Sequence, residues 1–187
     1  MTACASPWAF IALGGNLSSP WGQPADTLRQ ACHYLKALSH TPLVISPFYS
    51  TPPLTQPGSP DTPARYCNAV VALPPRLSPE PLMAQLLAIE RAAGRVRDPN
   101  NRYASRTLDL DLLAYGTLVC NTPLLTLPHP HAHTRAFVLV PWADVVQTLL
   151  KQGTLNADWP LPLANSTVML TAAHLPKDDL SRYNETT

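Results

Sequence analysis

The stretch SRTLDLDLL, from Ser105 to Leu113, places two aspartates two residues apart within a run of leucines. Side chains of a strand alternate between its two faces, so Asp109 and Asp111 are predicted to share one face while the intervening leucines fill the other. The two carboxylates then lie roughly 6 to 7 Å apart along the strand. The rest of the chain is best interpreted as a sheet built around this half-buried strand.

Two interpretations of the aspartate pair follow from its charge. Like charges side by side on a mostly buried strand repel, and the pKa of one carboxyl then rises unless a counter-charge is present. Magnesium bound by one or two carboxylates together with substrate phosphates removes that conflict. The alternative is a solvated edge strand whose aspartates pair with Arg106 or a neighbouring base. An Asp-x-Asp pattern alone does not decide between them.

Length and composition predict one domain, in which any anion site must be local. The chain has 187 residues, 45% of them apolar and 13% charged, with a net charge of +1. This balance implies neither wholesale disorder nor a broad electrostatic partner such as duplex DNA. The 22 prolines fall mostly between periodic segments, where they stiffen loops.

Cysteine spacing and the N-terminal sequence predict a cytoplasmic protein. The four cysteines lie far apart with no CxxC pair, which favours reduced thiols over disulfides or zinc: Cys4, Cys32, Cys67 and Cys120. The first positive charge is Arg29, so the apolar N-terminus lacks the charged region of a signal peptide, and no apolar run approaches transmembrane length.

The first half of the chain predicts a strand, a helix and a second strand. Residues 8–13 form an apolar run that Gly14 and Gly15 are expected to close with a tight turn. Ser18-Ser19-Pro20 is a candidate helix cap, followed by apolar residues at helical spacing. Residues 43–49 are typical of an edge or bulged strand because they contain Pro47.

The next segment predicts a strand and a helix that carry polar side chains. In residues 66–73, Tyr66 and Asn68 share one face, where a ring beside an amide suits a flat heterocycle. Ser78-Pro79 starts a helix that Gly94 is predicted to cap. Glu90 lies at the margin of its apolar stripe, either in a surface salt bridge with Arg91 or Arg95 or facing a ligand hydroxyl.

Residues 91–106 form a cationic loop that holds five arginines: Arg91, Arg95, Arg97, Arg102 and Arg106. The planar guanidinium suits bidentate phosphate binding, and the loop ends beside the aspartates, so we expect nucleotide phosphates between arginine and metal. Neither a Walker A sequence nor GxGxxG is present. A hairpin is predicted from Tyr115 and Gly116 through Leu125.

Three histidines at spacings of two follow in LPHPHAHTRAFVLVPW, residues 127–142. They are either a metal-binding tract or a proline-stiffened turn with one functional imidazole, His129; the intervening Pro130 favours the second. Phe137 is either core or a stacking ring. The element order predicts an α+β fold: a ferredoxin-like antiparallel sheet with helices packed against it, plus a C-terminal hairpin and helix extension.

Several segments, in this order, resemble one family. They are IALGGNL (11–17), YSTPPL (49–54), YCNAVVAL (66–73), IE with GRVR (89–97), RTLDLDLL (106–113), and LPHP with RAFVLVP (127–141). Together they are similar to 6-hydroxymethyl-7,8-dihydropterin pyrophosphokinase of the folate pathway. The resemblance implies a pyrophosphokinase domain over residues 1–150, with residues 151–187 an extension of the same domain, and a monomer without nucleic-acid or membrane partners.

The resemblance also implies a reaction and a set of residues. A pyrophosphoryl group passes from ATP to the hydroxymethyl oxygen of the reduced pterin, giving AMP, with two magnesium ions held by Asp109 and Asp111. Catalytic roles are implied for both aspartates and for Arg95, Arg102 and Arg106. Pterin contacts are implied for Gly14, Thr51, Pro52, Leu54, Tyr66, Asn68 and Phe137. ATP contacts are implied for Glu90, Arg97, Tyr103, Arg106, Leu112, Thr126, His129 and Arg135.

The chain departs from the family pattern in one loop. Members of the family usually show Arg-Trp-Gly-Pro-Arg, whereas this chain has Arg-Tyr-Ala-Ser-Arg at residues 102–106. The departure leaves the catalytic assignment standing and puts the closing of the loop over the substrates in question. Residue 130 is proline, which lacks the hydroxyl of the tyrosine found there in some relatives.

Two other function classes share single features with the chain. A nucleotide-sugar transferase also uses Asp-x-Asp with a divalent metal, but it needs a larger α/β fold and leaves Tyr66 and Asn68 unexplained. An RNA-binding ferredoxin-like module would use exposed aromatic residues and a spread basic face. Here the basic residues are concentrated in one loop.

Overall fold

The computed structural model describes residues 7–52, 64–97, 104–155 and 181–182. In chain order its elements are β1 (Ala9–Gly15), α1 (Pro24–Ala37), β2 (Val44–Ile45), β3 (Tyr49–Thr51), β4 (Tyr66–Leu73), α2 (Pro79–Ala92), β5 (Asp109–Tyr115), β6 (Cys120–Asn121), β7 (Thr126–Leu127), the 3₁₀ helix η1 (Ala132–Thr134), α3 (Ala136–Lys151) and β8 (Ser181–Arg182).

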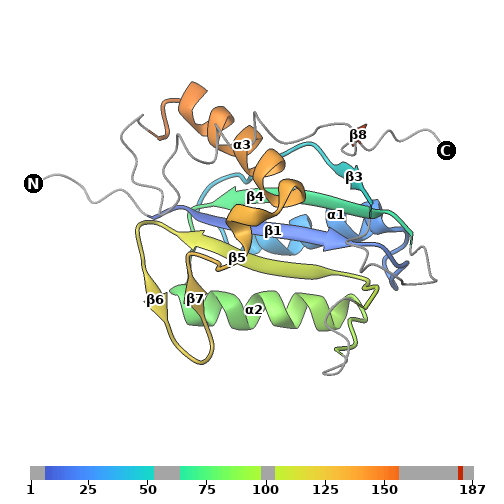
Figure 1. Ribbon diagram of the computed structural model, residues 1–187. Coiled ribbons are helices and arrows are strands. Elements are labelled where there is room, and N and C mark those ends of the chain that lie inside the picture. The colour runs from blue at the N-terminus through green and yellow to red at the C-terminus, as the bar shows by residue number, and fades with distance from the viewer. Residues whose placement is uncertain (1–6, 53–63, 98–103, 156–180, 183–187) are drawn as a thin grey trace, which may run out of the picture.

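One antiparallel sheet organises the molecule. Its strands run in the order β5-β1-β4-β3-β8, and β2 also pairs with β4. Helices α1 and α2 cover one face, and α3 lies across the other (Figure 1). The arrangement of β1, α1, the β2 and β3 segment, β4, α2 and β5 is that of a ferredoxin-like sheet. The predicted α+β fold is confirmed.

Strand alternation divides the apolar residues between two cores. The residues on the α1 and α2 side include Ile11, Leu13, Val71, Leu108, Leu110 and Leu112. Those on the α3 side include Phe10, Val70, Ala72, Leu113 and Trp142. The predicted strand at residues 66–73 and the helix cap at Ser78 are both confirmed, and Gly94 follows α2 with a φ of +75°, as a C-terminal glycine should.

β5 contains an irregularity that shifts its pairing with β1. Leu112 pairs with Ile11, but Ala114 pairs with Phe10, so Leu113 is an extra residue on the β5 side. Because of this bulge, Leu113 and Ala114 both join the core under α3, although they are consecutive. Simple alternation therefore holds through Leu113 and fails at Ala114.

Two predictions about the first elements were wrong. Gly14 and Gly15 lie inside β1 rather than in a turn, because both are paired with β4 and the backbone carbonyl of Thr107 closes on Gly15. Helix α1 begins at Pro24 rather than after Pro20. The Asp26 carboxylate accepts a hydrogen bond from the backbone N–H of Gln23 at 3.3 Å, which fixes the start of the helix there.

Three further findings concern short strands. Residues 43–49 contain β2 and the start of β3, because Pro47 interrupts the ladder. The predicted hairpin is present: after the turn at Gly116, β6 and β7 pair with each other, apart from the main sheet. Beyond residue 151, β8 pairs with β3. No described helix combines the length and apolar character needed to span a membrane.

The described cysteines are free, as predicted. Cys32 and Cys67 are buried and Cys120 is half-buried, while Cys4 lies outside the described residues. Burial raises the pKa of Cys32 to about 11 and that of Cys67 to about 12, so both remain protonated at neutral pH.

Candidate functional site

The two aspartates share the sheet face that carries α3. In β5, Asp109 pairs with Gly14 and Asp111 with Ala12, while Leu110 and Leu112 are buried on the opposite face. The predicted alternation of carboxylates and leucines is confirmed. Both carboxylates are half-buried, so they lie at a part of the face that α3 does not seal.

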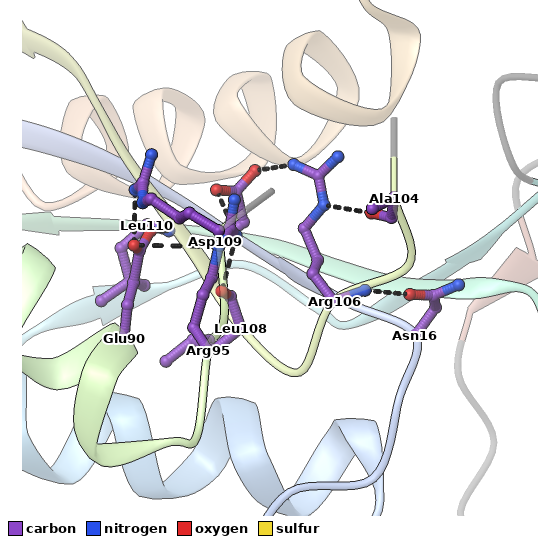
Figure 2. A network of polar contacts seen from close by, with 9 residues as sticks. Asn16, Glu90, Arg95, Ala104, Arg106, Leu108, Asp109 and Leu110 are labelled. Carbon is purple, nitrogen blue, oxygen red and sulfur yellow. Dashed lines mark hydrogen bonds and ion pairs between the residues drawn. The ribbon is translucent and has the colours of Figure 1, made fainter. Parts of the chain in front are cut away.

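Asp109 is held between two arginines. Its Oδ1 lies 2.6 Å from Nη1 of Arg95, and its Oδ2 lies 2.6 Å from Nη1 of Arg106 (Figure 2). Arg95 also donates to the carbonyl of Leu108 at 2.7 Å. The expected ion pair with Arg106 therefore forms, and a second arginine joins it. Two charge-assisted pairs on one carboxylate make this the strongest polar contact of the face.

Asp111 lies beside that cluster in an environment that disfavours its charged form. Burial, and then the charges of Asp109 and Glu90, raise its pKa to about 6, although Arg135 and Arg106 act in the opposite direction. This is the like-charge conflict that the sequence predicts for the pair. A cation placed between the two carboxylates would relieve it.

Glu90 is buried rather than marginal, with 1% of its surface exposed. Its Oε1 accepts a hydrogen bond from the backbone N–H of Leu110 at 2.8 Å, and its Oε2 lies 2.6 Å from Nη2 of Arg97. Arg95 is a weaker partner at 4.0 Å. Glu90 therefore does not form the surface salt bridge that was one of its two predicted roles. Its buried carboxylate instead holds the outer edge of β5 through the backbone N–H of Leu110.

Asn16, for which the sequence predicts no role, connects three segments of the site. Its Oδ1 accepts from the backbone N–H of Arg106 at 2.8 Å, and its Nδ2 donates to Oγ of Ser105 at 2.9 Å and to the carbonyl of Ala64 at 3.3 Å. The carbonyl of Arg106 in turn accepts from the backbone N–H of Asn16 at 2.9 Å. The only sequence signal was an asparagine directly after a strand.

Asn68 and Thr51 form a hydrogen-bonded pair at the other end of the same row. Asn68 Nδ2 donates to Oγ1 of Thr51 at 2.7 Å, and both residues are buried. Gly14 lies between Asn68 and Asp109 in the pairing of β4, β1 and β5. The three strands thus present an amide, a bare backbone and a carboxylate side by side.

The predicted aromatic residues are half-buried at two edges of this face. Tyr66 begins β4 opposite Thr51. Burial lowers the pKa of the Arg106 guanidinium, but Asp109 and the Tyr66 hydroxyl raise it by more, so the net shift is upward. The Tyr66 hydroxyl therefore lies beside the guanidinium of Arg106. Phe137 lies in the first turn of α3 and packs partly on the core, with the Arg135 guanidinium 5.9 Å from its ring centre.

Residues predicted to contact ATP line the outer edge of β5. Leu112 is 2% exposed, so its side chain belongs to the core and only its backbone faces that edge. The backbone N–H of His129 donates to the carbonyl of Leu113 at 2.9 Å. Burial, Arg135 and His131 lower the pKa of His129, which favours a neutral imidazole. Thr126 lies in β7 and donates to Oδ1 of Asn121 at 3.0 Å.

No group of three or more His, Cys, Asp or Glu side chains is placed to hold a metal ion within the described ranges. The histidine tract at residues 129–133 lies within those ranges. Pro52 is half-buried directly after β3. The predictions for Leu54, Arg102 and Tyr103, and for the closing of the loop around them, fall outside the described residues.

Comparison with known proteins identifies the family that this chain matches. The sequence pattern described as "7,8-dihydro-6-hydroxymethylpterin-pyrophosphokinase (HPPK)" matches residues 10–147. Two similar curated proteins are both named 2-amino-4-hydroxy-6-hydroxymethyldihydropteridine pyrophosphokinase. The one from Haemophilus influenzae is 41% identical over 76% of this chain and 83% of its own length. The one from Pseudomonas aeruginosa is 42% identical over 75% and 81%.

Solved structures agree on the fold. A crystal structure of an HPPK-DHPS in complex with substrates has a TM-score of 0.60 at 10% identity, covering 90% of this chain and 44% of that one. A Plasmodium falciparum HPPK-DHPS triple mutant with pteroate has a TM-score of 0.60 at 12% identity, covering 94% and 46%. This chain therefore spans less than half of either longer protein, and at such identities the likeness supports the fold alone.

Proposed function

The chain belongs to the 7,8-dihydro-6-hydroxymethylpterin-pyrophosphokinase family, and on that premise we propose that the polar face at β4, β1 and β5 is its reaction site. The chain is thus a diphosphotransferase of folate biosynthesis. The observation that carries the assignment of the site is the row Asn68, Gly14 and Asp109 across adjacent strands. Neither a nucleotide-sugar transferase nor an RNA-binding module accounts for it.

The pterin is proposed to occupy the amide end of the row. A flat heterocycle with several hydrogen-bonding edges needs a buried amide and a hydroxyl of fixed geometry, which the Asn68 and Thr51 pair supplies. Gly14 leaves room for that amide, because any side chain at this position would collide with Asn68. Tyr66 and Phe137 would contact the two faces of the ring, and Pro52 and Leu54 would complete the wall.

ATP is proposed to bind from the edge of β5 toward the carboxylates. The backbone of Leu112 would contact the adenine and Glu90 the ribose, with Thr126 and His129 nearby. Arg97, Arg106 and Arg135 would contact phosphates, with Arg95, Arg102 and Tyr103 closing over them. Arginine forks suit phosphate oxygens, and Arg95 and Arg106 are already gathered at Asp109.

In the proposed reaction the hydroxymethyl oxygen of the pterin bonds to the β-phosphorus of ATP. The bond from that phosphorus to the oxygen bridging the α-phosphate breaks, the hydroxyl loses its proton, and AMP leaves. Phosphoryl transfer asks the protein for alignment and for neutralisation of charge more than for covalent help. The chain supplies alignment through the rigid strands and neutralisation through the arginines.

The donor set at Asp109 and Asp111 fits magnesium. Two carboxylates without a third protein ligand suit an ion that completes its shell with phosphate oxygens and water. Burial, together with the charges of Asp109 and Glu90, raises the pKa of Asp111, so a cation beside this carboxyl would stabilise its charged form. Bound magnesium would neutralise charge on the phosphates; we propose two ions, both held by this pair.

We further propose that the protein is a cytoplasmic monomer whose residues 151–187 extend the domain formed by residues 1–150. The free cysteines support the first part, and the pairing of β8 with β3 supports the second.

The test of the function is the nucleotide product. With the reduced pterin and magnesium, ATP should yield AMP and the pterin diphosphate in equal amounts. Formation of ADP, or AMP formation that does not depend on the pterin, would contradict the proposed reaction.

A further inference from the structure

Tyr49 and Asp144 connect two elements that carry separate parts of the proposed pterin pocket. The Tyr49 hydroxyl donates to Oδ2 of Asp144 at 2.5 Å, and Tyr49 is only 7% exposed. Tyr49 opens β3, and Asp144 lies in the middle of α3. The bond therefore crosses from the edge of the sheet to the helix that covers its face.

On the sheet side, this bond anchors a strand of three residues. Tyr49 pairs with Asn68, and Thr51, two residues further on, has its side chain on the same face. Thr51 is the residue that accepts the hydrogen bond of Asn68. Because β3 is so short, the anchor at Tyr49 limits how far Thr51 can move away from the amide.

On the helix side, the bond anchors the face that carries Phe137. Asp144 follows Phe137 by seven residues, which is close to two helical turns, so the two side chains leave α3 on the same side. The hydrogen bond to Tyr49 therefore acts on the side of α3 that also carries Phe137. It links the strand of Thr51 to the helix of Phe137.

A residue from outside the family match adjoins the bond. Arg182 in β8 pairs with Tyr49 on the opposite edge from β4, and the family pattern ends at residue 147. Burial, followed by Asp144, raises the pKa of Tyr49 to about 12, while Arg182 acts to lower it. The phenol accordingly stays protonated at neutral pH, which it must to donate to Asp144.

We infer that Tyr49 and Asp144, supported by Arg182, are positioning residues that set the width of the pterin pocket without touching ATP. The inference rests on the proposed function, because it assumes that Thr51 and Phe137 contact the pterin. It adds three residues to the site, one of them from the C-terminal extension. Their loss should weaken pterin binding selectively.

The experiment compares Tyr49→Phe with a matched control in the full-length protein. Tyr115→Phe also removes one hydroxyl, which donates to the carbonyl of Leu77 at 3.0 Å away from the pocket. Calorimetry would give the Kd for 6-hydroxymethyl-7,8-dihydropterin and, separately, for magnesium ATP. Tyr49→Phe should raise the pterin Kd by roughly fivefold to tenfold, the cost of one charge-assisted hydrogen bond, and leave the ATP Kd unchanged. Tyr115→Phe should change neither.

Arg182 offers an independent test with a conservative rescue. Arg182→Ala should raise the pterin Kd by roughly twofold to threefold, less than Tyr49→Phe, as expected of an exposed charge, and Arg182→Lys should restore it. Asp144→Asn keeps the shape of the acceptor without its charge and should lie between wild type and Tyr49→Phe. It also replaces Tyr49→Phe as the decisive variant if the latter does not fold.

The outcomes separate this inference from the function. Equal losses for pterin and ATP, or no loss in either Tyr49→Phe or Asp144→Asn, would overturn the positioning role even if the enzyme still makes AMP. Wild-type protein that makes no AMP would instead overturn the proposed function.

Discussion

A Cβ atom built on Gly14 would lie 2.7 Å from Oδ1 of Asn68. Real Cβ atoms do not approach an oxygen so closely, so the amide of Asn68 occupies the space that any side chain on Gly14 would need. Gly14→Ala should therefore displace the amide, raise the pterin Kd by at least tenfold and cost about 1 to 3 kcal/mol of unfolding free energy. Calorimetry and urea denaturation measure the two effects.

A double variant checks that the collision is the cause. With Asn68→Ala the space is open, so adding Gly14→Ala to that background should cost clearly less stability than it does in wild type. Equal costs in both backgrounds would mean that Gly14 is needed for another reason.

The second prediction concerns the carboxylates of β5. Asp109→Ala and Asp111→Ala should each reduce turnover by at least a thousandfold while circular dichroism shows a retained fold, since neither change opens a core cavity. Glu80→Ala, at an exposed position of α2, is the control and should retain turnover. Substantial turnover with magnesium in either aspartate variant would remove that residue from the site.

The third prediction follows from the raised pKa of Asp111, about 6 in the folded protein against 3.8 for a free side chain. The folded state then binds the proton more tightly than the unfolded state between these values, so wild-type stability falls as pH rises from about 4 to 6. Asp111→Asn has no charge to bury. It should be more stable than wild type at pH 7.5, by on the order of 2 kcal/mol at most.

The pH series is measured in EDTA, because a bound cation would mask the effect. The advantage of Asp111→Asn should shrink as the pH falls through 6 and vanish near 4. If the difference in unfolding free energy between Asp111→Asn and wild type does not change with pH, then ionisation of Asp111 does not destabilise the folded protein.

The fourth prediction concerns Glu90, which accepts the backbone N–H of Leu110. Glu90→Ala should cost about 2 to 3 kcal/mol, because that buried N–H loses its acceptor and Arg97 its partner. Glu90→Gln should cost less, since the amide oxygen still accepts. Arg91→Ala, which removes one of the two candidate partners of a surface ion pair, should be neutral in chemical denaturation; a large cost there would favour that ion pair.

Elements whose signals are local in the sequence could be predicted from it, whereas those that depend on distant residues could not. β4 and α2 were predicted correctly because Asn68 and its neighbours alternate cleanly and because Ser78 and Pro79 are a local start signal. Helix α1 was misplaced because its start depends on Gln23 and Asp26, which are weaker signals by residue type than the serines before Pro20.

Long-range contacts carried no local signal. The alternation of β5 identified Asp109 and Asp111, and the excess of arginine identified their partners, but nothing near Asn16 pointed to Arg106, 90 residues away. The pairing of β8 with β3 was equally invisible, since two residues cannot show a period.

The fifth prediction tests that missed connection. Asn16→Ala leaves the backbone N–H of Arg106 without its acceptor and should cost about 1 to 3 kcal/mol. It should also lower turnover, because Arg106 is no longer held beside Asp109. Ser105→Ala removes only one of the two acceptors of Asn16 Nδ2 and should cost less in both thermal melting and kcat. If the two variants were equally impaired, the hydroxyl of Ser105 and not the backbone of Arg106 would be the important partner.

The bulge at Leu113 changes which side chains of β5 face α3. Up to Leu112 the strand alternates, with carboxylates toward α3 and leucines on the opposite face; Leu113 and Ala114 then both fill the core beneath α3. Deleting Leu113 would restore regular alternation with Asp111 and Ala114 still on the α3 face, so it should cost the burial of one leucine and leave the orientation of the carboxylates unchanged. The extra residue therefore gives the core beneath α3 a side chain that a regular strand would lack, without turning the carboxylates away from the proposed reaction surface.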